Sequence, residues 1–231
     1  MMNHLWLFLS VFSMLLPLHA EEQLATLKNP GFEEGSASDR LPSFWIGSVG
    51  QPHVYFMAEV DPVDASEGKS AVLCSSDPSH GAISQLTEFD LAPGSTYKIS
   101  ADLFSRVAPG VEPGGFWFRL LARNRANPAQ AYILQNVVGT PETLSAGEWV
   151  SKQIEWTAPS DLRSVPTISD GMSGGKPDGM ADLSIAIYGL EILIGGNYPQ
   201  KAKNIDLPLQ QTWIDNVEFS RFQPAPSTSN P

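Results

Sequence analysis

The chain has 231 residues, a formal net charge of −11 at pH 7 and one cysteine. This acidic balance argues against nucleic acid or an anionic membrane surface as a partner, because both require basic patches. The single cysteine, Cys74, excludes an internal disulfide. It lies in the apolar run 71–74, where we expect a buried thiol in a strand.

The N-terminus carries an apolar run over residues 5–18, which ends in Leu18-His19-Ala20. The run is shorter than the roughly 20 residues that a membrane-spanning helix needs, and its length is typical of the hydrophobic region of a signal peptide. No Lys or Arg precedes it, so an uncleaved anchor and a buried N-terminal helix are the alternatives. We expect a signal peptide over 1–20, a secreted or periplasmic protein, and no membrane insertion after cleavage.

The remaining chain has the pattern of a β protein. Short runs rich in β-branched and aromatic residues alternate with clusters of Pro, Gly, Ser and Asp, and no long stretch shows a 3.6-residue apolar period. Many short strands with turns between them predict an all-β sandwich or barrel. The predicted strands are 54–60, 70–75, 82–91, 96–106, 115–123, 131–138, 148–157, 183–188 and 212–222.

Two later segments, 163–182 and 195–210, are expected to be irregular loops, and loops of this length are usually functional or disordered. The tail 223–231 is rich in Pro and Ser and is expected to be disordered. About 200 residues, 21–222, then form one domain with a core of its own.

Alternation along the strands assigns their faces. In 97–103 the odd positions are apolar and the even ones polar, as in a half-buried strand. In 116–123 the even positions are apolar, so Trp117, Arg119 and Arg123 share the other face with Leu121. In 183–188, Tyr188 lies opposite the aliphatic positions.

Several motifs occur in a fixed order along the chain. They are LKNPGFEEG at 27–35 followed by Trp45, DASEGKSAVL at 64–73, LAPGSTYKISA at 91–101, Glu148-Trp149 with IEWTAP at 154–159, and TWIDNVEF at 212–219. The Pro93-Gly94 pair is a turn signal that reverses the chain before Tyr97.

This ordered set resembles the family 4/9-like carbohydrate-binding modules within the galactose-binding-domain-like jelly rolls, over residues 27–222. The resemblance implies a jelly-roll β-sandwich of two antiparallel sheets that binds a poly- or oligosaccharide. Pro30 and Ala71 stand where the family has Gly and Ser, and Asn216 replaces a second Asp. The remaining tryptophans at family positions, Trp149, Trp156 and Trp213, are expected in the core.

The same resemblance implies a structural calcium ion. Its ligands would be the carboxylates of Glu33 and Asp215 and backbone carbonyls near Gly68 and Lys69. Calcium takes 6–8 oxygen ligands of these kinds. The alternative is that both acids are ordinary turn and edge residues. A further acidic cluster in 170–182 lacks the spacing of an EF-hand and is expected to be a solvated loop.

A sugar-binding face needs aromatic rings, because the C–H patches of a pyranose stack on an apolar ring face. Trp117 is the first candidate, since it shares a face with two arginines. Those arginines suit acidic or sulfated glycans, or they pair with the protein's own carboxylates. The predicted ligand-binding residues are Trp117, Arg119, Arg123, Tyr188, Trp45 and Tyr55.

An enzyme is not expected. The two histidines after the signal peptide, His53 and His80, have no nucleophile motif around them, and no zinc-binding histidine pair occurs. We expect a non-catalytic, monomeric carbohydrate-binding module. The alternatives are an extracellular adhesion module for a protein or cell-surface partner, and a jelly-roll hydrolase or lyase with a convergent acid pair.

Overall fold

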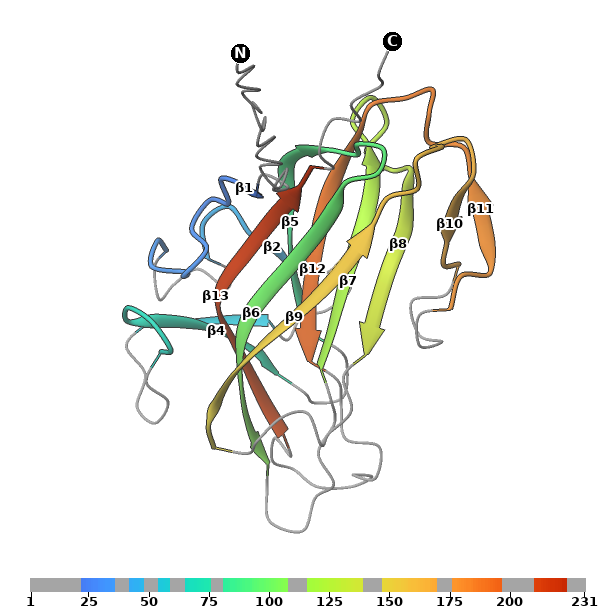
Figure 1. Cartoon of the computed structure of the whole chain (residues 1–231). Coiled ribbons are helices and arrows are strands. Elements are labelled where there is room, and N and C mark those ends of the chain that lie inside the picture. The colour runs from blue at the N-terminus through green and yellow to red at the C-terminus, as the bar shows by residue number, and fades with distance from the viewer. Residues whose placement is uncertain are drawn as a thin grey trace, which may run out of the picture.

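The computed structural model of the chain describes residues 22–35, 42–47, 54–58, 65–75, 81–107, 116–138, 147–169, 176–196 and 210–223. Two antiparallel β-sheets lie face to face and share one apolar core (Figure 1). This confirms the predicted all-β sandwich. Among the described residues, no helix is long and apolar enough to cross a membrane.

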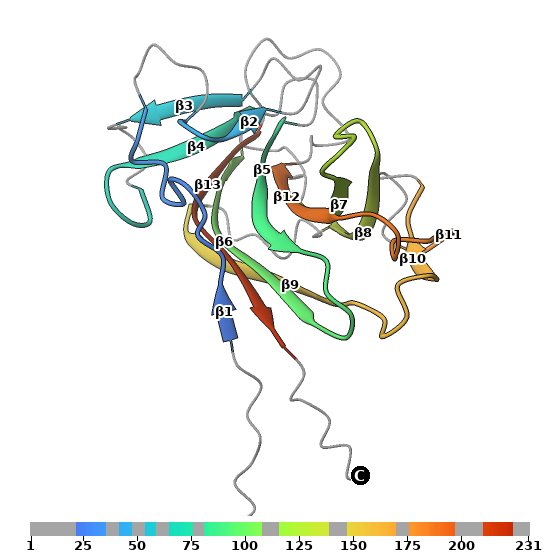
Figure 2. The ribbon, with the colours of Figure 1, turned by 90° about the horizontal axis from the view of Figure 1, so that it is seen from above.

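The first sheet, sheet I, contains both ends of the described chain. Its strand order is β3-β4-β13-β6-β9, and the short strand β1 also pairs with β13. Glu22 pairs with Phe222, so the first and last strands lie side by side (Figure 2). The strands of sheet I are β1 (Glu22–Leu24), β3 (Val54–Ala58), β4 (Ser70–Ser75), β6 (Thr96–Val107), β9 (Trp149–Thr157) and β13 (Gln210–Phe222).

The second sheet, sheet II, has the order β2-β5-β12-β7-β8. A small hairpin of β10 and β11 adjoins it through a bridge between Ile133 and Ile168 (Figure 1). The strands of sheet II are β2 (Ile46–Gly47), β5 (Gly81–Asp90), β7 (Phe116–Asn124), β8 (Ala131–Val138) and β12 (Tyr188–Gly196), and the hairpin strands are β10 (Val165–Thr167) and β11 (Gly179–Ala181).

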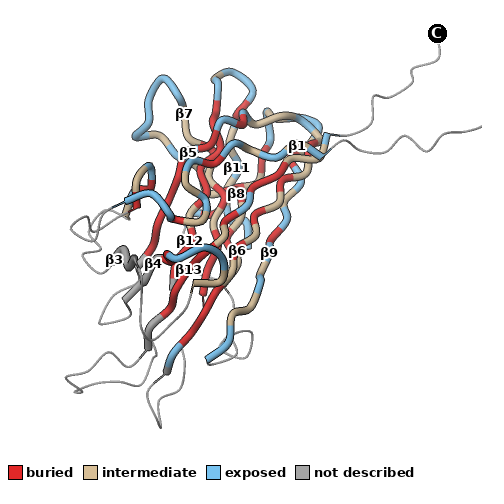
Figure 3. Tube along the Cα trace, turned by 90° about the vertical axis from the view of Figure 1, so that its left-hand side faces the viewer, coloured by how far each residue is buried: buried red, intermediate tan, exposed pale blue. Residues whose placement is uncertain are grey.

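The core follows the alternation of the sequence. In β6 the odd positions Tyr97 to Leu103 are buried, and in β7 the apolar even positions Phe116 to Ala122 are buried, as predicted. The ring of Tyr97 stacks against Phe219 of β13 at 6.1 Å between centroids. Figure 3 shows the buried positions following the strands through the middle of the molecule.

Three aromatic residues predicted in the core divide between two clusters. Trp156 packs against the main core, but Trp213 is buried on the opposite face of sheet I with Phe104 and Trp149. The predicted burial is confirmed for Trp213, which belongs to this second core cluster, while Trp149 is only partly buried against it. Since Leu103 faces the core, its neighbour Phe104 faces away, and the pairing of Phe104 with both tryptophans puts all three on that outer face.

Two predicted segments have the wrong structure. The segment 163–182 contains β10 and β11, and the strand expected over 183–188 begins only at Tyr188. Asp182 Oδ1 accepts hydrogen bonds from the backbone N–H (2.9 Å) and hydroxyl (2.6 Å) of Ser184. This local turn competes with strand pairing, and it leaves Ile185 86% exposed. The aliphatic alternation of 183–188 is therefore not a strand signal.

Some predictions lie outside the described residues. They are the signal peptide over 1–20, most of the loop 195–210, the tail after residue 223, and the side chains of Tyr55 and Cys74, although both residues lie in strands.

Candidate functional site

The outer face of β7 carries the residues that we predicted as a sugar platform. Trp117 is only 5% exposed, and the Arg119 guanidinium lies 4.3 Å from the centroid of its ring. Arg119 Nε also donates a hydrogen bond of 3.0 Å to Asn136 Oδ1. Trp117 and Arg119 do lie on the predicted face, but the buried ring of Trp117 is not accessible as a sugar platform, because Arg119 lies over it.

Arg123 on the same face is paired internally. Its guanidinium forms an ion pair with Glu191, a buried carboxylate of β12, and donates a hydrogen bond of 2.6 Å to the carbonyl of Pro128. Of the two alternatives for this arginine, pairing with the protein's own carboxylate is the one that the structure supports.

Two of the other predicted aromatic residues are part of the core. Trp45 is buried, its ring lies 5.2 Å from Phe32, and its Nε1 donates to the carbonyl of Asn29 at 2.9 Å. Tyr188 is buried in an edge-to-face contact with Tyr132. Their prediction as sugar platforms is wrong, because neither ring is accessible to a ligand.

An accessible hollow lies at the edge of sheet II and was not predicted. β2 pairs with β5 only at Ser84 and Ile83, and the following β5 residues, Gln85 to Glu88, border a groove of about 390 Å³. We call this the edge groove. Three of its apolar lining residues are exposed to solvent: Phe44 (54%), Ile46 (61%) and Leu86 (42%).

The buried amide of Gln85 ties the two sides of the edge groove to β5. Its Oε1 accepts a hydrogen bond from the backbone N–H of Lys28 at 2.8 Å, and its Nε2 donates to the carbonyls of Lys28 (2.9 Å) and Phe44 (3.3 Å). A buried amide with three hydrogen bonds holds both backbone segments in fixed positions.

Phe44 is held outward by its backbone. Its φ of 70° is in the left-handed region, which is rare for a bulky residue and costs free energy. The next residue, Trp45, is anchored in the core and donates its backbone N–H to the carbonyl of Pro42 at 3.2 Å. Because Trp45 points inward and the turn is tight, Phe44 points toward solvent.

The rim of the edge groove is polar. Lys28 Nζ lies 5.3 Å from the centroid of the Phe44 ring. Glu88 Oε1 accepts a hydrogen bond from the backbone N–H of Thr26 at 2.7 Å. At one end Arg125 is paired with Asp90 at 2.8 Å. The charges of these four side chains, two positive and two negative, sum to zero.

The predicted metal ligands meet at one loop, Ser66–Ser70. Asp215 Oδ2 accepts hydrogen bonds from the backbone N–H groups of Ser66 (2.9 Å) and Glu67 (3.1 Å). Glu33 Oε1 accepts from those of Lys69 (2.8 Å) and Ser70 (3.0 Å). The structure thus brings both acids to the predicted loop, although both bind it through N–H groups.

Asp215 is fully buried, and burial raises the pKa of its carboxyl to about 6 against the opposing effect of its hydrogen bonds. Asp102 lies opposite it in β6 and accepts a 2.7 Å hydrogen bond from the Ser66 hydroxyl. A buried charge beside a second carboxylate suits a cation. Within the described ranges, however, no group of three or more acidic, His or Cys side chains surrounds one point. Calcium would therefore need backbone oxygens and water as its remaining ligands.

Comparison with known proteins gives similar structures only. No protein-family model matches the chain, and no curated protein matches it. It is similar to TmCBM61 solved with β-1,4-galactotriose (17% identity, 84% of this chain and 97% of that chain, TM-score 0.43). It is also similar to the CBM22-1 xylan-binding domain of Paenibacillus barcinonensis Xyn10C (13% identity, 90% of this chain and 98% of that chain, TM-score 0.45). A third similar structure is the enzymatically active domain of bacteriophage CBA120 tailspike protein 4 (12% identity, 84% of this chain and 21% of that chain, TM-score 0.46). At these identities and TM-scores no activity is transferred, so the function has to be inferred from the residues of the site.

Proposed function

We propose that the chain is a non-catalytic carbohydrate-binding module that holds a poly- or oligosaccharide in the edge groove. The observation that carries this proposal is the Phe44 ring, which a strained backbone holds in solvent beside the apolar side chains of Ile46 and Leu86. The C–H face of a pyranose packs on such a ring, while its hydroxyl groups hydrogen-bond to the polar rim.

The charges favour a neutral saccharide. The charges of Lys28, Glu88 and Arg125, which line the edge groove, and of Asp90, which pairs with Arg125, cancel. The whole chain carries −11, which repels a polyanion. This differs from the acidic or sulfated ligand that free arginines would suit, since Arg123 and Arg125 both have carboxylate partners.

Binding rather than hydrolysis is proposed because glycoside hydrolases generally act through a pair of carboxylates that flank the bond to be cut. Among the described residues that line the edge groove, Glu88 is the one carboxylate.

Removing the ring tests the proposal. We expect Phe44→Ala to weaken retention in affinity gels containing neutral polysaccharides by at least about tenfold, which corresponds to about 1.4 kcal/mol. Ile185→Ala, which truncates an exposed apolar residue outside the edge groove, is the matched control and should be retained like the wild type. Equal retention of Phe44→Ala and wild type would rule out this ring as the platform.

We further propose that calcium binds at the loop Ser66–Ser70 and stabilises the sandwich. Glu33 and Asp215 would supply carboxylate oxygens there, and the bound ion would offset the cost of burying the Asp215 charge. This proposal is supported by the buried carboxylate and is independent of the saccharide.

Thermal unfolding tests the metal. We expect millimolar calcium to raise the melting temperature of the chelator-treated wild type, because a ligand that binds only the folded state stabilises it. Asp215→Asn should lose most of that increase, while Asp161→Asn, at an exposed ion pair elsewhere, should keep it. No calcium-dependent rise in the wild type would refute the site.

A further inference from the structure

Arg125 lies at the end of the edge groove, on a loop that is fixed by its own hydrogen bonds. Asn124 Oδ1 accepts from the backbone N–H groups of Ala126 (2.8 Å) and Asn127 (3.2 Å), which closes a turn directly after β7. The backbone N–H of Arg125 donates to the carbonyl of Ile187 at 3.0 Å. The main chain that carries this arginine is therefore held in place on both sides.

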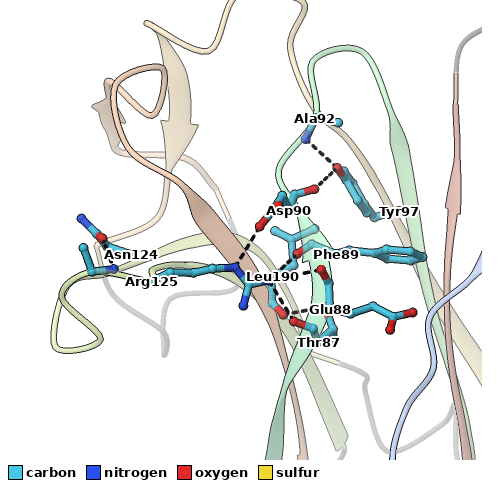
Figure 4. Close-up of polar contacts among 10 residues, drawn as sticks. Thr87, Glu88, Phe89, Asp90, Ala92, Tyr97, Asn124, Arg125 and Leu190 are labelled. Atoms are coloured by element: carbon cyan, nitrogen blue, oxygen red, sulfur yellow. Dashed lines mark hydrogen bonds and ion pairs between the residues drawn. The ribbon is translucent and has the colours of Figure 1, made fainter.

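The guanidinium is fixed as firmly as the loop. Its Nε donates to Asp90 Oδ1 at 2.8 Å, and its Nη2 lies within hydrogen-bonding distance of the carbonyls of Thr87 (3.1 Å) and Glu88 (3.2 Å) (Figure 4). It crosses β12 at Gly189, where an added Cβ would lie 2.5 Å from the Arg125 Cζ. Only glycine leaves room for the guanidinium in this position.

The end of β5 that holds Arg125 is itself tied to the other sheet. The Tyr97 hydroxyl donates to the carbonyl of Asp90 at 3.0 Å and accepts from the backbone N–H of Ala92 at 2.7 Å (Figure 4). A rigid support of this kind reduces the entropy that the side chain loses when a ligand binds.

Part of the guanidinium is left for a ligand. The hydrogen bonds of Arg125 to described residues use Nε and Nη2, and none of them uses Nη1. The side chain is 34% exposed and lines the edge groove. Nη1 carries two N–H donors in the guanidinium plane, and neighbouring hydroxyl oxygens of a sugar can accept both.

The ion pair with Asp90 determines which ligand oxygen is preferred. Because Asp90 balances the charge of Arg125, a ligand carboxylate gains little net Coulomb attraction here. The hydroxyl oxygens of a neutral sugar accept hydrogen bonds from N–H groups and do not depend on a net positive charge, so they suit a guanidinium that is paired with Asp90.

We propose that Arg125 is a specificity-determining residue of the edge groove, which donates from Nη1 to hydroxyl oxygens of a neutral saccharide stacked on Phe44. This inference rests on the proposed carbohydrate binding and names the residue that orients the sugar at one end of the groove.

Two variants test the role of Arg125. Arg125→Lys removes the planar donors, and Gly189→Ala keeps the arginine but displaces its guanidinium. Each should weaken the binding of a neutral hexasaccharide at least about fivefold by titration calorimetry, with β-1,4-galactohexaose and β-1,4-xylohexaose as the probes. Arg163→Lys, at an ion pair outside the edge groove, is the control and should bind like the wild type.

A second measurement separates ligand contact from structural support. Deoxygenated analogues of the bound probe, one hydroxyl at a time, should include one whose loss weakens the wild type but leaves Arg125→Lys unchanged. If Arg125 had a purely structural role, the ratio of wild-type affinity to variant affinity would be the same for the parent probe and for every analogue. That result would overturn the inference.

The outcomes distinguish this inference from the proposed function. If the wild type binds and both variants bind equally well, the role of Arg125 is refuted while carbohydrate binding stands. If the wild type binds neither hexasaccharide nor any neutral glycan on an array, the proposed function fails and the inference fails with it. Stronger wild-type binding to polygalacturonate than to neutral glycans would contradict the preference for hydroxyl groups.

Discussion

Phe44 combines two unfavourable features, a positive φ and a ring that is more than half exposed. A left-handed conformation costs a bulky residue about 1–2 kcal/mol, and the ring recovers only part of the free energy that burial would provide. Residues with a strained backbone that the surrounding structure holds in place cluster at binding and active sites. At the residue scale this combination is the strongest indication that the edge groove has a function.

Asp215 gives a pH-dependent prediction at the same scale. Its pKa is about 6 in the folded protein and 3.8 in a model peptide. Between these values the folded state keeps a proton that the unfolded state has lost, so the free energy of unfolding falls as pH rises. With chelator present, we expect Asp215→Asn to gain stability relative to wild type between pH 4 and 7, by up to about 3 kcal/mol.

Chemical denaturation of both proteins at several pH values measures this difference. Asp161→Asn is a suitable control. Hydrogen bonds with Arg163 lower the pKa of Asp161 to about 2, so in the folded protein this carboxyl titrates below the range of pH 4 to 7. A difference between Asp215→Asn and wild type that stays constant from pH 4 to 7 would show that the Asp215 carboxyl titrates normally.

At the element scale, the edge groove exists because β2 is only two residues long. After Ser84, β5 has no strand partner on that side within the described chain, and side chains from the N-terminal segment border it instead. Gln85 and Glu88 bind the backbone of Lys28 and Thr26 there. A two-residue strand has no measurable periodicity, so the sequence could not predict it, and the groove was missed with it.

The alternation of longer strands correctly predicted which side chains face the core, but not whether the outward side chains are exposed. It placed Trp117 opposite the core residues of β7, yet the ring is covered by Arg119. Whether an outward ring is exposed depends on contacts across the sheet, such as the hydrogen bond to Asn136 of β8 that holds Arg119 beside Trp117. These are contacts between residues distant in sequence, which a local pattern does not record.

The residues of the proposed calcium site were predicted in a different way. Glu33, Asp215 and the Ser66–Ser70 loop were expected together from the resemblance, and the structure does bring them together. The one signal within the sequence that points to Phe44 is its position beside Trp45, in a turn that follows Pro42. That signal alone does not distinguish an exposed ring from a buried one.

At the scale of the whole molecule, the first and last strands, β1 and β13, pair with each other in sheet I (Figure 2). The loop Ser66–Ser70 binds Glu33 from the N-terminal part of the domain and Asp215 from the C-terminal part. The edge groove lies on the other sheet. The proposed calcium and saccharide sites therefore use different residues. Variants of the loop Ser66–Ser70 should change the melting temperature and leave saccharide binding in the edge groove unchanged.

The central claim is that a neutral saccharide binds in the edge groove. Backbone amide shifts in a nitrogen-15 NMR titration with neutral hexasaccharides of galactan, xylan and glucan locate the ligand directly. We predict the largest changes at Lys28, Phe44, Leu86 and Arg125. Changes concentrated at Arg119 and Leu121 in the middle of sheet II, or no change with any of these glycans, would contradict the claim.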